Sequence, residues 1–189
     1  MEYRIKDLLE VKRGSSPRPI QNYISDKGYK WLKISDFKLG DKFVYTTKEY
    51  IIEDGLKNTK FVKKGTLLLT NSATPGIPIF LGEDMCLHDG FLFFNNIRED
   101  ILNIEYMYCW FLNNRNFVIN QANGSVFKNL KKEIIENVVI NLPNKNIQDK
   151  IVKVYNCITN KIINNNQTND NLYEIGIELD RKSTRLNSS

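Results

Sequence analysis

The sequence has few of the residues on which metal sites, disulfide frameworks and membrane spans depend. Its 189 residues include three cysteines, which stand far apart, and a single histidine, His88. An odd number of scattered cysteines argues against a disulfide framework or a zinc site, and one histidine excludes chemistry that needs two. The longest uninterrupted apolar run covers residues 107–112, far short of the roughly 18 residues that a membrane span needs. Residues 1–7 are highly charged and no apolar segment follows them, so we expect no signal peptide and a cytoplasmic protein.

Signatures of several enzyme classes are absent as well. The chain contains no G-x-x-x-x-G-K-[ST], G-x-G-x-x-G or G-x-S-x-G motif, so neither a phosphate-cradling loop nor a nucleophile elbow is indicated. The stretch NLPN at residues 141–144 does not match the Asn/Asp-Pro-Pro-aromatic motif of amino-methyltransferases. Glu10 and Lys12 have the E-x-K spacing of metal-dependent nucleases, but no Pro-Asp pair accompanies them. We interpret His88 and Asp89 as a turn before a buried strand rather than an acid–base pair, and we predict a protein that is not an enzyme.

The composition is that of a folded protein, with 41% hydrophobic, 11% aromatic and 26% charged residues and a formal net charge of +5. Much of that charge lies in residues 180–189, which read DRKSTRLNSS and match, codon by codon, the in-frame translation of a common sequencing adapter. We therefore expect this segment not to be native and the native C-terminal part of the protein to be missing. Residues 1–180 carry 24 basic and 22 acidic side chains, a formal charge of +2. Bulk charge thus gives little support to nucleic-acid binding.

Residues 1–143 alternate short strand-like runs with glycine, proline and asparagine, which predicts one domain of mixed α and β structure. Pro78 lacks a backbone donor, so we expect the run that contains it to be an edge strand or an irregular piece. Two amphipathic segments predict helices. The predicted strands are residues 31–34, 43–45, 65–70, 77–81 and 90–94, and the predicted helices are residues 104–120 and 129–137.

Residues 144–179 differ from the domain before them, because they contain one glycine, no proline, and apolar residues spaced four and three apart. This spacing is that of a coiled-coil seam and predicts a helix of some 35 residues, roughly 50 Å long. The seam turns polar across residues 164–171 and is apolar again beyond them. Such a helix needs a partner helix; the alternative is a shorter helix that ends near Ile163 and an Asn-rich loop. The residues expected to pair are Ile147, Ile151, Val154, Ile158, Leu172 and Ile175.

Basic and polar side chains gather in several loop-like stretches. Arg13 and Arg18 lie in KRGSSPR at residues 12–18, where guanidinium and exposed backbone N–H groups can donate to phosphate oxygens. An asparagine amide both donates and accepts, which suits it to adenine in the major groove. Singly, each stretch is typical of a solvated loop, and only the set as a whole favours nucleic acid. The candidate DNA-binding residues are Arg13, Arg18, Lys33, Lys64, Asn71, Thr74, Ser125, Lys128 and Asn129.

Short motifs also follow one another in a recognisable order. They are LLEV at residues 8–11, GSSP at 14–17, WLKISD at 31–36, KGTLL at 64–68, TPG at 74–76, EYMY at 105–108, GSVFKNL at 124–130 and INLP at 140–143, followed by Gln148 and Ile151. GSVFKNL is the most specific of these motifs, whereas WLKISD lacks the proline expected before it. The ordered set spans residues 1–179. It resembles the target-recognition domain of type I restriction–modification DNA specificity subunits, followed by the conserved helix of that family.

The resemblance implies an α+β module, a mixed-sheet target-recognition domain at residues 1–143, followed by a long coiled-coil-forming helix at residues 144–179. It implies that the module reads one half of a bipartite target in double-stranded DNA. Its helix would pair with a second recognition half, or with a second copy, and dock methyltransferase and restriction subunits. The chain itself would need no cofactor, because S-adenosylmethionine, ATP and Mg²⁺ belong to the partner subunits.

Full subunits of the family carry two recognition domains and two long helices, whereas this chain holds one of each. Two other interpretations therefore stay open. The chain is a recognition domain torn from a fused restriction–methylation enzyme, or it is an assembly protein that binds no DNA.

Overall fold

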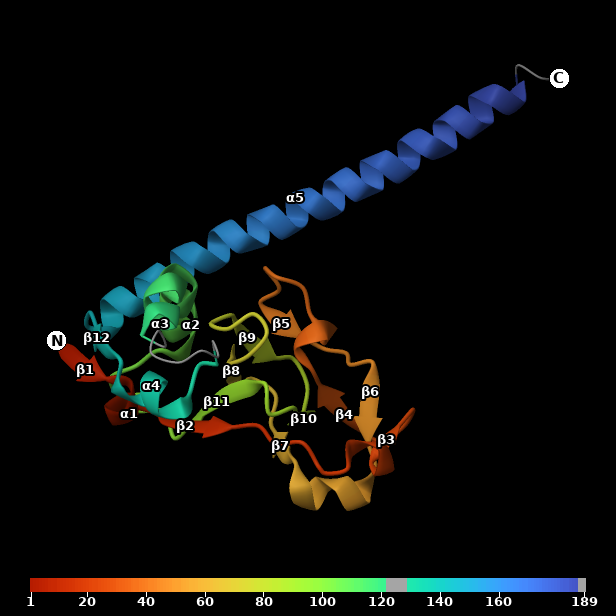
Figure 1. Ribbon diagram of the computed structural model, residues 1–189. Coiled ribbons are helices and arrows are strands. Elements are labelled where there is room, and N and C mark those ends of the chain that lie inside the picture. Colours follow the sequence, from red (N-terminus) through yellow and green to blue (C-terminus); the bar gives the residue numbers. More distant parts are fainter. Residues whose placement is uncertain (122–128, 187–189) are drawn as a thin grey trace. The chain divides into compact units, whose positions relative to one another are not determined.

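The computed structural model describes residues 1–121 and 129–186 and divides the chain into two compact units, Met1–Gln148 and Asp149–Ser189. The first unit contains mixed sheets and short helices, and the second belongs to one long helix (Figure 1). The α+β fold predicted from the sequence is confirmed. Among the described residues, none of the helices combines the length and the hydropathy that crossing a membrane requires.

Two five-stranded sheets form the body of the first unit, in the strand orders β3–β6–β4–β10–β7 and β2–β11–β8–β9–β5. The first sheet consists of β3 (Ile24–Ser25), β6 (Glu49–Ile51), β4 (Tyr29–Leu32), β10 (Met85–Leu87) and β7 (Lys60–Val62). The second consists of β2 (Glu10–Arg13), β11 (Phe91–Asn95), β8 (Leu67–Thr70), β9 (Pro78–Leu81) and β5 (Phe43–Val44). Both sheets are mixed, since β4 pairs with β10 in parallel and β5 with β9 in parallel, while the other pairs are antiparallel.

A separate two-stranded pair joins the beginning of the first unit to its end. β1 (Glu2–Arg4) runs antiparallel to β12 (Val139–Asn141), with Tyr3 opposite Ile140. The pair continues into backbone bonds on either side, from Ile5 N to Val138 O at 3.0 Å and from Leu142 N to Met1 O at 2.8 Å. Sequence reasoning did not predict β1, because its three residues are mostly polar and exposed.

The strand that contains Pro78 is not an edge strand, so this prediction was wrong. β9 is fully buried and lies between β8 and β5. The N–H of Phe80 points toward β5, where it donates to Lys42 O at 2.9 Å, and Pro78, two residues earlier, faces the same side. β5 begins opposite Phe80. The missing donor of Pro78 therefore breaks no ladder bond, as expected for a proline at the first position of a strand.

The helices differ from the predicted ranges at their ends. The segment 104–120 forms α2 (Ile104–Asn113) and α3 (Arg115–Asn120), because Asn114 leaves the helical conformation with φ −109° and ψ 19° and its Nδ2 donates to Trp110 O at 2.9 Å. α4 covers Lys132–Asn137, and α1 covers Ile5–Leu8. α5 runs without a break over Lys145–Leu186, so the alternative of a helix ending near Ile163 is wrong. Three short 3-10 helices are η1 (Ile20–Asn22), η2 (Ile34–Asp36) and η3 (Glu53–Asn58).

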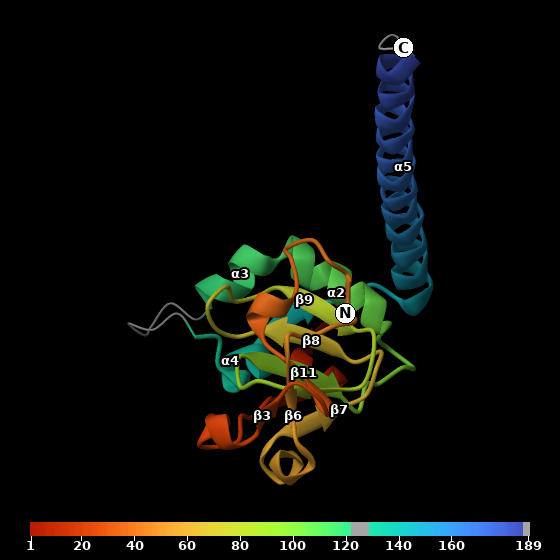
Figure 2. The same ribbon diagram turned by 90° about the vertical axis from the view of Figure 1, so that its right-hand side faces the viewer.

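The main core cluster of the first unit joins the two sheets, because Leu32, Met85 and Leu87 of the first sheet pack in one cluster with buried residues of β8, β9 and β11 of the second. α2 covers one face of this sheet (Figure 2), where Tyr108 stacks on Phe80 with ring centroids 5.3 Å apart and Phe111 stacks on Phe94 at 5.4 Å. Leu67, Leu68 and Leu69 of β8 are 0% exposed. Each such side chain contributes about 1.5–3 kcal/mol through burial. Burial thus stabilises the central strands, and the turns at their ends are held in place by them.

Candidate nucleic-acid interface

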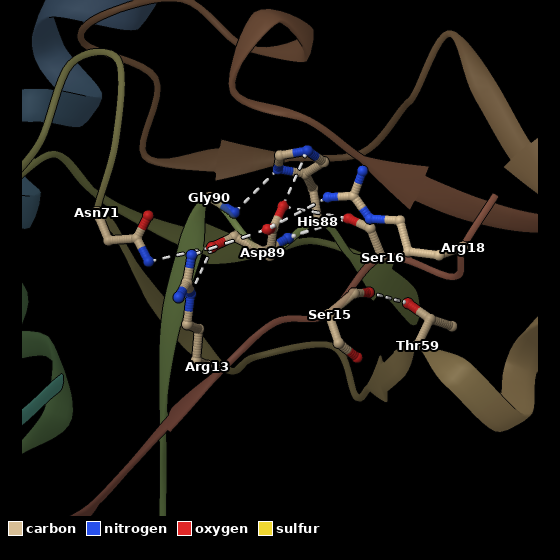
Figure 3. Close-up of polar contacts among 9 residues, drawn as sticks. All are labelled: Arg13, Ser15, Ser16, Arg18, Thr59, Asn71, His88, Asp89 and Gly90. Atoms are coloured by element: carbon tan, nitrogen blue, oxygen red, sulfur yellow. Dashed lines mark hydrogen bonds and ion pairs between the residues drawn. The ribbon is translucent and has the colours of Figure 1, made fainter. Parts of the chain in front are cut away.

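The strand ends of the second sheet bring three distant segments together. β2 and β8 both run antiparallel to β11, with Arg13 opposite Leu92 and Thr70 opposite Phe91. The last residues of β2 and β8 therefore meet at the beginning of β11. Arg13, Asn71 and the turn formed by His88, Asp89 and Gly90 lie together at this edge (Figure 3).

The first sheet ends at the same turn. β4 and β10 are parallel neighbours, so their C-terminal ends meet, and His88 N donates to Leu32 O at 3.1 Å. The His88 ring lies 5.5 Å from the Trp31 ring. The turn that sequence reasoning predicted at residues 88–90 is thus present, and it connects the two sheets.

Asp89 is the centre of a polar cluster at this turn. Its Oδ2 lies 3.8 Å from Arg13 Nη2 and 3.9 Å from Arg18 Nη2, and its backbone carbonyl accepts a hydrogen bond from Arg13 Nε at 2.9 Å. The two arginine side chains are 56% and 75% exposed. Two candidate DNA-binding residues therefore share one carboxylate and keep more than half of their side-chain surface exposed.

The carboxylate of Asp89 is held on its other side by Ser16 and His88. Ser16 Oγ lies 3.2 Å and His88 Nε2 lies 3.1 Å from Asp89 Oδ1. Gly90 N donates to His88 Nδ1 at 2.9 Å, so the neutral imidazole carries its proton on Nε2, which lies beside the Asp89 carboxylate. Burial lowers the pKa of His88; Asp89 opposes this effect, and the nearby arginines and Lys33 add to it. His88 is therefore neutral near pH 7.

The loop that carries Ser16 and Arg18 is fixed by backbone bonds. Gly14 N donates to Phe91 O at 2.9 Å, Ser15 N donates to Leu87 O at 3.1 Å, and Thr59 Oγ1 donates to Ser15 O at 2.8 Å. A Cβ at Gly14 would overlap the carbonyl oxygen of His88. Glycine is needed here because the two backbones approach so closely.

Asn71 is at the centre of this edge but is only 4% exposed. Its Nδ2 donates to Asp89 O at 3.1 Å, its N–H donates to Gly90 O at 2.9 Å, and its carbonyl accepts from Leu130 N at 2.8 Å. Its side-chain oxygen is buried and has no hydrogen-bond partner among the described residues. In this arrangement Asn71 links the turn at residues 88–90 to the segment that precedes α4.

A cavity of about 360 Å³ adjoins Arg13 and Asn71. Three of its lining residues, Arg13, Lys131 and Lys132, are basic, which favours an anion at this surface. The lining residues are Arg13, Asn71, Asn129, Leu130, Lys131, Lys132 and Glu133. Three candidate residues, Arg13, Asn71 and Asn129, thus line one cavity although they are far apart in the sequence.

The remaining candidate residues are more scattered. Lys33 lies at the end of β4, with its Nζ 2.5 Å from Glu49 Oε1 and 5.6 Å from the centre of the Trp31 ring. Thr74 is exposed in the loop after Asn71. Lys64 precedes β8 and lies at its opposite end, where its N–H donates to Asp84 Oδ1 at 2.9 Å. Ser125 and Lys128 lie outside the described residues.

Sequence reasoning missed Ser16, Asp89 and Lys131 as members of the cluster and its cavity. Glycine and serine around Arg13 and Arg18 indicated a loop, but no local signal shows which acidic residue faces it. Asp89 is 76 residues away from Arg13 and meets it only through the pairing of β2 with β11. Among the described residues, no group of three or more His, Cys, Asp and Glu side chains is arranged to hold a metal ion.

The seam residues of α5 form the second feature with a possible binding role. Ile147, Ile151, Val154, Ile158, Leu172 and Ile175 are between 41% and 61% exposed. Leu179, which continues the same register, is 62% exposed. Lys161, Asn165 and Thr168 on the intervening turns are also exposed. Both apolar stretches of the helix therefore offer an uncovered stripe.

A family model described as the type I restriction modification DNA specificity domain matches residues 1–174. The chain is 28% identical over 182 residues to the type I restriction enzyme MjaIX specificity subunit of Methanocaldococcus jannaschii, covering 93% of this chain and 41% of that protein. The fold is similar to that of the HsdS subunit from Thermoanaerobacter tengcongensis, with a TM-score of 0.66 at 17% identity over 86% of this chain and 38% of the other. A type I restriction–modification S subunit from M. genitalium gives a TM-score of 0.60 at 16% identity, over 87% of this chain and 40% of the other. The chain thus spans about two fifths of the length of each of these proteins.

Proposed function

The chain belongs to the type I restriction–modification DNA specificity family, and we propose that it reads one half of a bipartite target in double-stranded DNA. The observation that carries the proposal is the convergence of Arg13, Arg18 and Asn71 on the turn at residues 88–90. These residues come from two separate segments and meet at a third, and each was singled out by its chemistry. Methylation and cleavage, with S-adenosylmethionine, ATP and Mg²⁺, are assigned to partner subunits.

Exposure divides the cluster into two roles. Arg13 and Arg18 are open and cationic, which suits contacts to phosphates that position a protein on a duplex. Asn129 and Lys131 are exposed beside the cavity, which suits contacts to base edges. Asn71 is buried and binds the backbone of both parts, at Asp89 O and at Leu130 N.

The helix α5 supports the second part of the proposal, which is docking. An exposed apolar stripe on a helix of 42 residues is unfavourable in water unless a partner covers it. We assign the stripe to pairing with the helix of a second recognition half or of a second copy. Methyltransferase and restriction subunits would then dock on the paired helices.

Selection from a pool of random-sequence duplexes tests DNA reading. The complex of this chain with methyltransferase subunits of its own system is incubated with the pool, and the bound duplexes are sequenced. We expect a split motif. Two identical copies joined through α5 would select an inverted repeat, because the symmetry of a dimer is reflected in its site.

The opposite results separate the alternatives. Equal binding of all sequences, without dependence on salt, would support an assembly protein and contradict DNA reading.

A variant with Ile158→Lys and Leu172→Lys should lose association with its partner, measured by sedimentation velocity, whereas Lys153→Glu off the seam should keep it. The genomic sequence downstream of residue 179 tests the fused-enzyme alternative, which predicts methyltransferase motifs there instead of a second recognition domain.

A further inference from the structure

Asp89 is an acidic residue at the centre of a surface that should receive an anion. Its Oδ2 faces two exposed arginines at 3.8 and 3.9 Å. We propose that Asp89 is an internal counter-anion that weakens the binding of backbone phosphate to Arg13 and Arg18, and so sets the sequence-independent part of DNA affinity. The inference rests on the proposed function and adds to it a residue that tunes the same surface.

The distances place the two arginines near the carboxylate without engaging them fully. Both Nη2–Oδ2 separations exceed hydrogen-bond length, so neither guanidinium forms the paired, two-bond contact that is typical of a strong ion pair. The short bond of Arg13 goes to the main chain of Asp89 instead. The charge of Asp89 therefore lowers the local potential while leaving the donors of both arginines available.

The position of the carboxylate is fixed independently of the arginines. Ser16 Oγ donates a hydrogen bond to Oδ1 at 3.2 Å, His88 Nε2 lies 3.1 Å from the same oxygen, and His88 is itself oriented by the N–H of Gly90. Oδ2 is thereby kept on the side of the arginines. An asparagine at this position can accept the Ser16 hydrogen bond through its own Oδ1, so Asp89→Asn removes the charge and preserves that support.

The net charge of the cluster decides the direction of the effect. Two arginines, one carboxylate and a neutral histidine leave a single positive charge to meet a phosphate. A phosphate bound by both arginines lies close to Asp89, and two negative charges at such a separation repel each other even near the protein surface. Removing the carboxylate should strengthen binding to every duplex alike, because phosphate contacts do not depend on sequence.

The test uses the full chain and a random-sequence duplex, with affinity measured by fluorescence anisotropy from about 50 mM to about 200 mM salt. We expect D89N to bind about threefold to tenfold more tightly than wild type at the lowest salt, with a smaller gain as the salt concentration rises. The matched control is Asp100→Asn. Asp100 pairs with Arg98 at 3.0 Å beyond the far end of β11, so D100N makes the same change in net charge without this gain.

A second comparison tests the route through the arginines. In a background of Arg13→Gln and Arg18→Gln, adding D89N should no longer raise affinity. The proposal is overturned if D89N binds the duplex as wild type does or more weakly, or if its gain persists without the arginines. If D89N is not folded at the assay temperature, Asp89→Ser replaces it in both comparisons and the same outcomes decide. Failure of wild type to bind any duplex at low salt would instead reject the proposed function itself.

Discussion

Arg13 Nε donates a 2.9 Å hydrogen bond to the backbone carbonyl of Asp89. The main chain of the turn before β11 therefore orients a side chain of β2, the strand that pairs with β11. The guanidinium thereby keeps both Nη groups for other acceptors. Asn71 Nδ2 donates to the same carbonyl at 3.1 Å. The direction of Arg13 thus depends on backbone geometry, which substitution of neighbouring side chains changes little.

Replacing Arg13 by glutamine should weaken binding to all duplexes by a similar factor. A phosphate contact carries no sequence information, and losing one lowers the slope of log affinity against log salt by about 1. Arg98→Gln is the control. Arg98 lies beyond the C-terminal end of β11, so this change should leave the slope unchanged. A loss confined to one duplex sequence would show instead that Arg13 contacts a base edge.

Replacing Gly14 by alanine should lower the free energy of unfolding of the first unit by about 2–4 kcal/mol. The added methyl would overlap the carbonyl of His88, which belongs to rigid main chain. Denaturant titration followed by tryptophan fluorescence measures the change, since Trp31 lies beside His88. At Gly176 an added Cβ would meet no described atom within 4 Å apart from the adjacent backbone of its own helix, so Gly176→Ala should leave this transition in place. Equal stability of both variants would contradict the close approach at Gly14.

Acidification should destabilise the first unit through His88. Burial lowers the pKa of His88 in the folded state below its ordinary value of 6.5. Between that lowered pKa and 6.5 the unfolded chain binds more protons than the folded chain. The contribution of His88 to the free energy of unfolding is therefore fully present above pH 6.5 and is lost as the pH falls through this window. Unfolding measured between pH 7.5 and pH 5 should show this decline in wild type and a flatter profile in His88→Gln. Stability that rises on acidification would contradict the environment described for His88.

The three cysteines should react with thiol reagents in a set order. Burial raises the pKa of Cys86 to about 11 and also raises that of Cys109, whereas Cys157 is exposed on α5. Since the thiolate is the reactive form, Cys157 should be labelled first at pH 8, Cys109 more slowly, and Cys86 only on unfolding. Mass spectrometry after timed alkylation gives the order. Early labelling of Cys86 would contradict its place in the first sheet.

Hydrophobic runs were the strongest guide to the fold. β8, β9 and β11 are buried on both faces, so their sequences are continuously apolar and predict strands. β2, with the sequence EVKR, and β7, with KFV, have no such signal. β2 forms a strand by pairing with β11, and β7 by pairing with β10. A short stretch of sequence does not show such pairing between distant segments.

The candidate site shows the same division between local and non-local information. Arg13 and Arg18 were identifiable because small, flexible residues surround them, which is a local property. Asp89 could be assigned only to a turn, because its meeting with the arginines depends on strand register. Asn71 was singled out for its amide chemistry, but its burial follows from the packing of Gly90 and Leu130 against it.

The pairing of β1 with β12 has a consequence for how such a module is built into longer proteins. The chain enters and leaves the recognition unit on adjacent strands, about 4.8 Å apart. The whole unit can therefore be inserted into a longer polypeptide as a cassette. The segments before and after the insertion then stay close together in space. Under the proposed function, exchange of one cassette for another would change the DNA sequence that is read while leaving the flanking segments joined as before.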